Sequence, residues 1–308
     1  MMDDSNTNPG RFRLRLPATS ANLGSGFDAA AVALDFYLEI EAEPAAEFSI
    51  VATGRDREQC SRLEGNLILG IYKDLLVGNA RPVIPLAIRM ANDIPLGMGC
   101  GSSAAGRLAA IALADHFGRL AWSSERVLQE AAALEGHPDN VTACWLGGFV
   151  TGASEGSVFH VAHVVPPAHW RAILVLPTEP LATSKARAVL PAGYSRADVV
   201  ANIQSVSLLG LAFAQARGDL LRLAMRDRIH QPYRAPFCPL LDRLLPLAGD
   251  HRILGAALSG AGPSVLVIAD HEESVPQAVA AIREATKGQG EPELKLCRFE
   301  PKGAIQSF

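Results

Sequence analysis

The stretch Pro95-Leu-Gly-Met-Gly-Cys-Gly-Ser-Ser-Ala-Ala105 decides how the rest of the chain is interpreted. Glycines alternate here at 97, 99 and 101, and two serines and an alanine-rich segment follow. Glycine tolerates backbone angles that other residues avoid, and it lets a ligand approach the main chain closely. A helix beginning at Ser102 or Ser103 would present free N–H groups and a positive dipole end to this loop. The stretch therefore predicts a phosphate site, with a serine-capped glycine turn as the simpler alternative.

This loop differs from a Walker loop, because no Gly-Lys-Ser or Gly-Lys-Thr follows its glycines. The expected phosphate site thus lacks the lysine that usually accompanies a glycine-rich phosphate loop. Any further positive charge must come from elsewhere in the chain or from a metal ion.

The overall composition is that of a globular protein with room for two domains. The chain has 308 residues, a formal net charge of −4, 49% hydrophobic residues and 19% charged residues. Its length suggests two domains. The mild acidity argues against a nucleic-acid partner. No run approaches the ~18 uninterrupted apolar residues of a membrane span, so no membrane association is expected.

The cysteines and the first residues indicate a cytoplasmic protein. The five cysteines are scattered, and no Cys-x-x-Cys pair occurs that would suggest zinc or redox chemistry. Such a set fits a reducing compartment. Residues 1–10 are polar and lack the basic and apolar segments of a signal peptide, so we expect a disordered tail there.

Hydrophobic periodicity predicts strands and helices in both halves of the chain. Strands are expected over 11–16, 27–34, 36–42, 47–53, 83–90, 146–151, 157–163, 170–176, 253–258, 263–269 and 293–299. Helices are expected over 66–76, 103–117, 123–134, 183–190, 195–216, 219–228, 239–247 and 274–285. This mixture is α+β in character. We place the boundary between the two domains at 160–161, giving domains over 11–160 and 161–308.

Four polar loops interrupt these elements, and their amino-acid sequences resemble those of a known family. They are Pro17-Ala-Thr-Ser-Ala-Asn-Leu-Gly-Ser-Gly-Phe-Asp28, the glycine loop, Glu135-Gly-His-Pro-Asp-Asn140 and Leu258-Ser-Gly-Ala-Gly-Pro-Ser264. In this order they resemble the loops of the GHMP small-molecule kinases, and most closely those of the homoserine kinases. The resemblance covers about residues 11–300.

The departures from the family pattern are small. Cys100 stands where the family usually has leucine, Ser25 replaces a frequent proline, and Ala29-Ala-Ala31 replaces a common x-Leu-Gly. A buried cysteine packs as a small apolar residue. None of these changes removes a polar group that the chemistry needs.

The resemblance implies both a fold and a reaction. The fold is a two-domain α+β fold, with a ribosomal-S5-like N-terminal domain and a ferredoxin-like C-terminal domain. The reaction is transfer of the γ-phosphoryl group of ATP to the side-chain hydroxyl of L-homoserine, a step toward threonine. The alternatives are another GHMP kinase, of the mevalonate or diphosphocytidyl-methylerythritol type, and a non-catalytic sensor on the same fold. A homodimer is implied by the resemblance alone.

The same resemblance assigns the donor site. The phosphate-binding positions are Pro95, Leu96, Gly97, Met98, Gly99, Cys100, Gly101, Ser102, Ser103, Ala104 and Ala105, with Gly260 and Gly262 in a second tight turn. Mg²⁺ prefers oxygen ligands and keeps several waters, so one carboxylate and one hydroxyl suffice. The family-matched metal ligands are Glu135 and Ser103, with Ser102 as the alternative hydroxyl.

The acceptor site is also implied by position. Asn22, Asp28 and His137 would contact the polar groups of homoserine, and Arg187 and Arg234 would clamp its carboxylate. A guanidinium can hold a carboxylate with two parallel hydrogen bonds, which lysine cannot reproduce. The interpretation of these five residues depends on the family, because each is unremarkable in its own segment.

The residues expected at the reacting atoms are Asn22, Glu135 and Asn140. Asn140 stands where mevalonate-type relatives use an aspartate base, and an amide cannot take up a proton. We therefore hypothesise that no side chain acts as general base. In this scheme the substrate hydroxyl passes its proton to the transferred phosphate.

Overall fold

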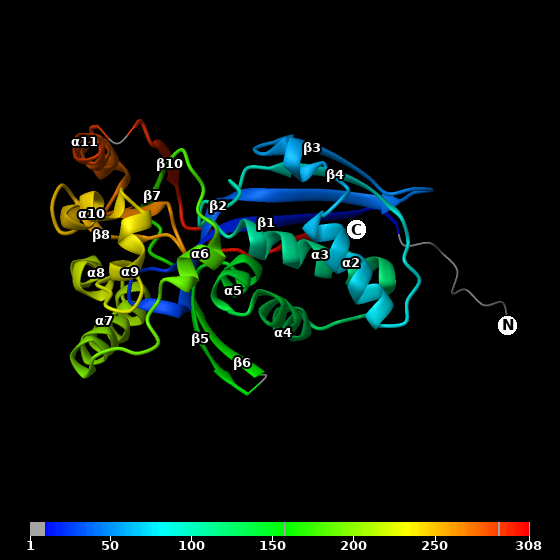
Figure 1. The fold of residues 1–308 in the computed structure, drawn as a ribbon, viewed down its shortest axis with the longest axis horizontal. Coiled ribbons are helices and arrows are strands. Elements are labelled where there is room, and N and C mark those ends of the chain that lie inside the picture. Colours follow the sequence, from blue (N-terminus) through cyan, green and yellow to red (C-terminus); the bar gives the residue numbers. More distant parts are fainter. Residues whose placement is uncertain (1–9, 157, 289, 308) are drawn as a thin grey trace.

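The computed structural model describes residues 10–156, 158–288 and 290–307, so the expected tail over 1–10 lies almost wholly outside the described residues. Within these ranges the strands form a seven-stranded sheet and a four-stranded sheet, and helices pack on both. The two sheets and their helices lie side by side along the long axis of the molecule (Figure 1). The expected α+β class is confirmed.

The larger sheet is organised around one long strand. Its members are β1 (Phe12–Asn22), β2 (Gly26–Pro44), β3 (Ser49–Gly54), β4 (Leu86–Asn92), β5 (Phe149–Glu155), β6 (Val158–Val164) and β11 (Ile305–Ser307). The order is β11-β1-β2-β4-β3, and β5 pairs with both β2 and β6. Because β2 has 19 residues, its first part pairs with β5 and its second part with β4.

Helices cover one face of this sheet (Figure 1). They are α2 (Leu67–Gly78), α3 (Ser102–Gly118), α4 (Ser124–Glu135) and α5 (Asp139–Leu146). The short α1 (Arg57–Cys60) follows β3 and contacts that strand. Helix α3 is the central one, and it contacts β1, α2, α4 and α5. It is rich in alanine and largely buried, because small side chains allow neighbouring backbones to approach on several sides. This packing fixes the position of the glycine loop at its N-terminus.

The second unit contains the smaller sheet. Strands β7 (Arg171–Leu176), β8 (Ile253–Leu258), β9 (Val265–Ala269) and β10 (Glu293–Cys297) pair antiparallel in the order β10-β7-β9-β8. The helices of this half are α6 (Thr183–Ala188), α7 (Arg196–Ala214), α8 (Gly218–Ala224), α9 (Gln231–Arg234), α10 (Leu241–Leu244) and α11 (Val275–Ala285). Strand β9 is buried along its whole length, which explains its continuous apolar run.

Three expectations differ from the observed elements. The predicted loop over 17–28 is mostly strand: β1 continues to Asn22, and only residues 23–25 separate it from β2. The side chains at 18–22 are buried, so their small and polar types lie inside the fold rather than in a surface loop. The predicted boundary at 160–161 falls inside β6. Strand β11, from the predicted second domain, pairs with β1 in the first sheet.

Among the described helices, α7 is the one that is long and apolar enough to cross a membrane by length and composition. Its inner face is part of the core, where Ser205, Leu209 and Phe213 are buried. The Phe213 ring stacks on Phe149 of β5 with their centroids 4.3 Å apart. Helix α7 therefore packs as a covering helix of the fold, and the expected lack of a membrane partner stays a prediction.

Candidate active site

The glycine loop adopts the conformation that its sequence predicts. Gly97, Gly99 and Gly101 have φ angles of 69°, 75° and 74°. A Cβ atom at Gly99 would lie 2.2 Å from the carbonyl oxygen of Ser259, and one at Gly101 would lie 2.0 Å from Thr19 Oγ1. Gly101 is the N-cap of α3, whose first helical residue is Ser102. The free N–H groups of this helix end therefore sit directly behind the loop.

The second tight turn is tied to the glycine loop and to the end of β1. The hydroxyl of Ser259 donates a hydrogen bond of 2.8 Å to the carbonyl oxygen of Gly99. The amide of Gly260 donates to the carbonyl of Ala21 over 3.0 Å, and Asn22 Nδ2 donates to the carbonyl of Gly260 over 2.8 Å. Asn22 has a positive φ of 69°, which turns its side chain away from the regular strand direction. Segments distant in sequence thus meet at one point.

A cleft opens at this point, and most of the expected site residues line it. The lining residues are Asn22, Asp28, Gly97, Gly99, Cys100, Gly101, Ser102, Ser103, Glu135, His137, Asp139, Asn140, Thr183, Arg187, Arg234, Gly260 and Ala261. The structure therefore brings the predicted donor and acceptor residues to one place. Asp139, Thr183 and Ala261 were not among the predicted residues.

Six of the predicted phosphate-loop positions lie outside this cleft lining. Pro95, Leu96 and Met98 line a separate hollow. Ala104 and Ala105 are buried in α3. Gly262 is also buried, and a Cβ atom there would meet Cys238 Sγ at 2.8 Å. These residues belong to the two turns and to the start of α3 but do not line the cleft.

The predicted metal ligands are neighbours on the cleft wall. Glu135 is the last residue of α4, and its Oε2 accepts a hydrogen bond of 3.3 Å from the hydroxyl of Ser103. A carboxylate and a hydroxyl at this spacing fit an ion that prefers oxygen ligands. Arg107, which was not predicted, also reaches this carboxylate, with Nη1 2.6 Å from Oε2. Its place one helical turn after Ser103 is a signal that sequence could have offered.

The connection between α4 and α5 forms a hydrogen-bonded cluster. Asp139 Oδ1 accepts from His137 Nδ1 and from the amide of Asn140, each over 2.7 Å. The hydroxyl of Thr19 donates to Asn140 Oδ1 over 2.6 Å. Burial lowers the pKa of His137, but the hydrogen bond and charge of Asp139 outweigh it, so the pKa is raised above 6.5. Because Thr19 donates to it, the amide oxygen of Asn140 already has a hydrogen-bond partner within the protein.

Asp28 and Arg187 form a bidentate ion pair in the cleft. Asp28 Oδ1 lies 2.7 Å from Arg187 Nη2, and Oδ2 lies 3.1 Å from Nη1. Ligand atoms of Asp28, His137 and Asp139 also lie within 4.8 Å of one another. Two carboxylates and an imidazole thus converge beside a guanidinium. This arrangement offers separate places for a positive and a negative group of one small molecule.

Arg234 is a buried arginine held by three polar partners. Its side chain is on α9, and the residue is only 1% exposed. Its Nε donates to the carbonyl of Ala186 over 3.0 Å, and Nη1 lies 3.1 Å from His230 Nδ1 and 3.4 Å from the carbonyl of Gly260. Burial lowers the pKa of Arg234, and the neighbouring charge of Arg187 lowers it further. A buried cation of this kind favours an anionic ligand.

His230 and Asp227, which were not predicted, position Arg234. His230 Nε2 donates to the carbonyl of Gly24 over 2.8 Å, which leaves Nδ1 free to accept from Arg234. Burial lowers the pKa of His230, so the ring is neutral. Asp227 accepts from the backbone amides of His230 and Gln231, over 2.9 Å and 2.6 Å. No sequence pattern marked these residues, because their roles depend on contacts made only in the fold.

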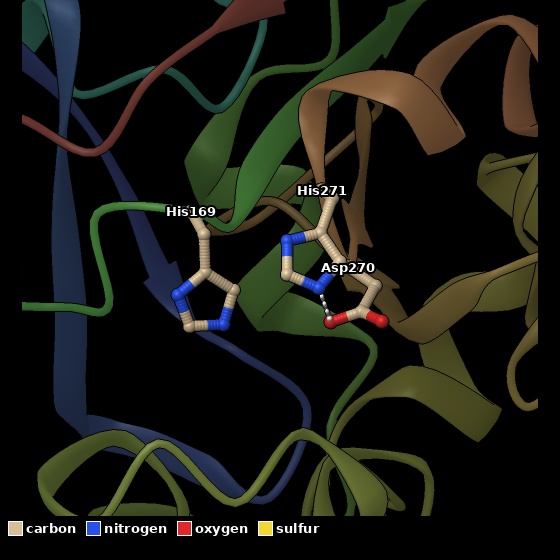
Figure 2. A group of neighbouring side chains, drawn as sticks. All are labelled: His169, Asp270 and His271. Carbon is tan, nitrogen blue, oxygen red and sulfur yellow. Dashed lines mark ion pairs between the residues drawn. The ribbon is translucent and has the colours of Figure 1, made fainter.

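A second cluster of histidine and aspartate lies outside the cleft. Figure 2 shows His169, before β7, beside Asp270 and His271, which follow β9. The two imidazole rings stack with centroids 4.7 Å apart, and His271 Nε2 lies 3.5 Å from Asp270 Oδ1. Both histidines are exposed. None of these three residues lines the cleft.

Comparison with family models gives matches in both halves of the chain. Residues 66–148 match the N-terminal domain of GHMP kinases, and residues 211–288 match the C-terminal domain. The first match includes the glycine loop, Glu135 and Asn140. The second includes Arg234 and the turn at Gly260.

Individual relatives extend this likeness over nearly the whole chain. A homoserine kinase of Solibacter usitatus is 43% identical over 273 residues, which cover 88% of this chain and 90% of that protein. The crystal structure of a homoserine kinase from Cytophaga hutchinsonii matches with a TM-score of 0.83, at 23% identity and full coverage of both chains. A putative homoserine kinase of Listeria monocytogenes matches with a TM-score of 0.79 at 28% identity, covering 96% of this chain and 99% of that one.

Proposed function

The chain belongs to the GHMP kinase family and to its homoserine kinases, and we propose that its cleft transfers the γ-phosphoryl group of ATP to the side-chain hydroxyl of L-homoserine. The product is O-phospho-L-homoserine, an intermediate of threonine biosynthesis. The observation that carries this assignment is the charge arrangement of the acceptor side. Arg187, Asp28 and the buried Arg234 lie beside a glycine loop built for phosphate.

The acceptor side suits a zwitterionic amino acid. Asp28, with His137 and Asp139 close to it, offers negative charge for an α-ammonium group. Arg187 and Arg234 offer two guanidinium groups for the α-carboxylate, and both lie over the Phe27 ring, 5.7 Å and 5.4 Å from its centroid. The ion pair between Asp28 and Arg187 must loosen as the substrate inserts. The two charges are then matched by the ligand rather than by each other.

The donor side relies on the backbone and on oxygen ligands. The N–H groups at the start of α3 point toward phosphate oxygens, and the helix dipole adds to their attraction. Glu135 and Ser103 would hold Mg²⁺, which when bound neutralises charge on the phosphates. Asn22 lies where the two sides meet, with its amide fixed by Gly260 and by the backbone of Asp28. We assign it to orienting the acceptor hydroxyl.

Proton transfer in this scheme needs no protein base. Asn140 cannot accept a proton, and its oxygen already accepts from Thr19. Asp139 is buried and accepts from His137 and the amide of Asn140. Asp28 is paired with Arg187. The acceptor hydroxyl therefore passes its proton to the transferred phosphate, and catalysis comes from positioning and from charge neutralisation.

A coupled ADP-release assay tests the proposal against its alternatives. The purified chain is supplied with Mg²⁺ and ATP and with homoserine, mevalonate or diphosphocytidyl-methylerythritol in turn. We expect turnover with homoserine alone. Turnover with another alcohol instead would move the chain to a different branch of the family, and binding of ATP without turnover of any alcohol would favour the sensor. We place the enzyme in the cytoplasm as a homodimer, without nucleic-acid or membrane partners.

A further inference from the structure

The guanidinium of Arg107 lies against the two proposed metal ligands, Glu135 and Ser103. It lies on α3 one turn after Ser103, and its Nη1 is 2.6 Å from Glu135 Oε2. The same nitrogen contacts the hydroxyl of Ser103, and Nε donates to the carbonyl of Leu134 over 3.1 Å. The side chain of Glu135 is 10% exposed and that of Arg107 is 21% exposed. The ion pair is thus partly buried, and its carboxylate partner, Glu135, lines the cleft.

This pairing conflicts with metal binding at the same oxygen. A divalent cation and a guanidinium repel each other, and both seek Glu135 Oε2. When the metal takes that carboxylate, the guanidinium loses its partner and becomes a desolvated charge that needs another anion. The anions brought by a nucleoside triphosphate are its phosphates. A guanidinium binds phosphate oxygens with paired, charge-assisted hydrogen bonds.

We propose that Arg107 is a further donor-site residue, which pairs with Glu135 in the absence of metal and binds the phosphates of the nucleotide once the metal takes that carboxylate. It thereby supplies the side-chain cation that the glycine loop lacks after Gly101. The proposal rests on the assignment of the cleft as an ATP site. It predicts that removing this charge has opposite effects on the metal alone and on the metal–nucleotide complex.

A purely structural role must be separated from this one. Because Nε donates to the carbonyl of Leu134, Arg107 also caps the last turn of α4. Arg107→Gln keeps an amide donor for that carbonyl while it removes the charge. Arg126→Gln is the matched control, because Arg126 pairs with Glu130 over 2.9 Å on the exposed side of α4, away from the cleft.

The experiment measures two affinities on the full chain. Titration calorimetry gives the affinity for a non-hydrolysable ATP analogue in the presence of Mg²⁺, and electron paramagnetic resonance gives the affinity for Mn²⁺ alone. For Arg107→Gln we expect analogue binding to weaken about 10- to 100-fold, the usual range for loss of a hydrogen bond to a charged group. We expect Mn²⁺ binding without nucleotide to become several-fold tighter. Arg126→Gln should change neither affinity.

Other outcomes overturn the proposal. If both affinities fall, Arg107 only holds Glu135 in place; if both rise, or analogue binding is unchanged, it is only a competitor of the metal. Thermal unfolding of each variant checks that the fold is intact, and Arg107→Lys gives a second test, with partial recovery of analogue binding expected. Homoserine turnover by the unaltered chain separates these failures from failure of the proposed function.

Discussion

Replacing Arg234 by methionine tests the acceptor site most directly. The change keeps an unbranched apolar chain about as long as the aliphatic stem of arginine, and it removes a guanidinium from a residue that is 1% exposed. If the guanidinium binds the substrate carboxylate, its loss leaves that anion partly unpaired in a desolvated cleft. Losing one partner of such a pair costs about 2–5 kcal/mol. Because Arg187 remains to bind the carboxylate, we expect the lower part of this range, about 2–3 kcal/mol.

The expected result is specific to one substrate. A loss of about 2–3 kcal/mol corresponds to roughly 30- to 150-fold weaker homoserine binding. Binding of Mg²⁺ and an ATP analogue should change little, because Arg234 lies on the acceptor side. Titration calorimetry measures both affinities. Arg243→Met is the matched control, because Arg243 is an exposed arginine on α10.

The Arg234→Met variant must remain folded for its ligand affinities to be compared with those of the unaltered chain. The substitution removes donors from the carbonyl of Ala186 and from His230 Nδ1, and an unpaired buried group costs about 1–3 kcal/mol. Removing a buried charge offsets part of that cost. We expect a modest fall in the unfolding temperature. Equal weakening for both ligands, or unchanged homoserine affinity in a folded variant, would refute the assignment of Arg234.

Three further predictions concern the other parts of the cleft. Gly101→Ala should lower the free energy of unfolding by about 2–4 kcal/mol, because the residue has positive φ and its Cβ would strike Thr19; Gly70→Ala, in open space on α2, should not. The raised pKa of His137 adds stability that is fully present below pH 6.5 and is lost as the pH rises through that pKa. Urea unfolding should show this loss, and His137→Gln should abolish it. The pH–rate profile of the chemical step should show no carboxylate titration, whereas Asn140→Asp should introduce one; a titration abolished by Asp139→Asn would contradict the scheme.

The regular elements were largely predictable because their patterns are local. The composition and length of two segments indicated helix α3 and the buried strand β9, and both were expected close to their observed positions. The predicted loop over 17–28 was wrong because its glycines and serines suggested solvent exposure. In the structure these residues are buried: Ser20 lies in β1, Gly26 begins β2, and Gly24 and Ser25 connect the two strands. Strand β11 and helix α9 were missed because three or four residues show no periodicity.

The positions of the site residues were predictable, but the hydrogen bonds and ion pairs among them were not. The family resemblance assigned Asn22, Asp28 and Arg187 to one site, and all three line the same cleft, although nothing in their own segments marked them. It did not reveal that Asp28 and Arg187 bind each other, because pairing depends on two elements 159 residues apart. The same limit applies to His230, because its lowered pKa follows from burial and its ring is oriented by a hydrogen bond to the carbonyl of Gly24.

Strand β11 has a consequence for the order in which this chain can mature. Arg13, Leu14 and Arg15 of β1 face Ser307, Gln306 and Ile305, so the edge of the first sheet is closed by residues made some 290 positions later. Until those residues emerge from the ribosome, β1 exposes unpaired backbone groups that could recruit another strand. Residues 298–304 hold the segment before β11 in place through backbone bonds to Ala33 and Asp35 of β2 and to Trp145 of α5. A fragment ending after β6 would keep the whole glycine loop and yet carry an open, aggregation-prone edge.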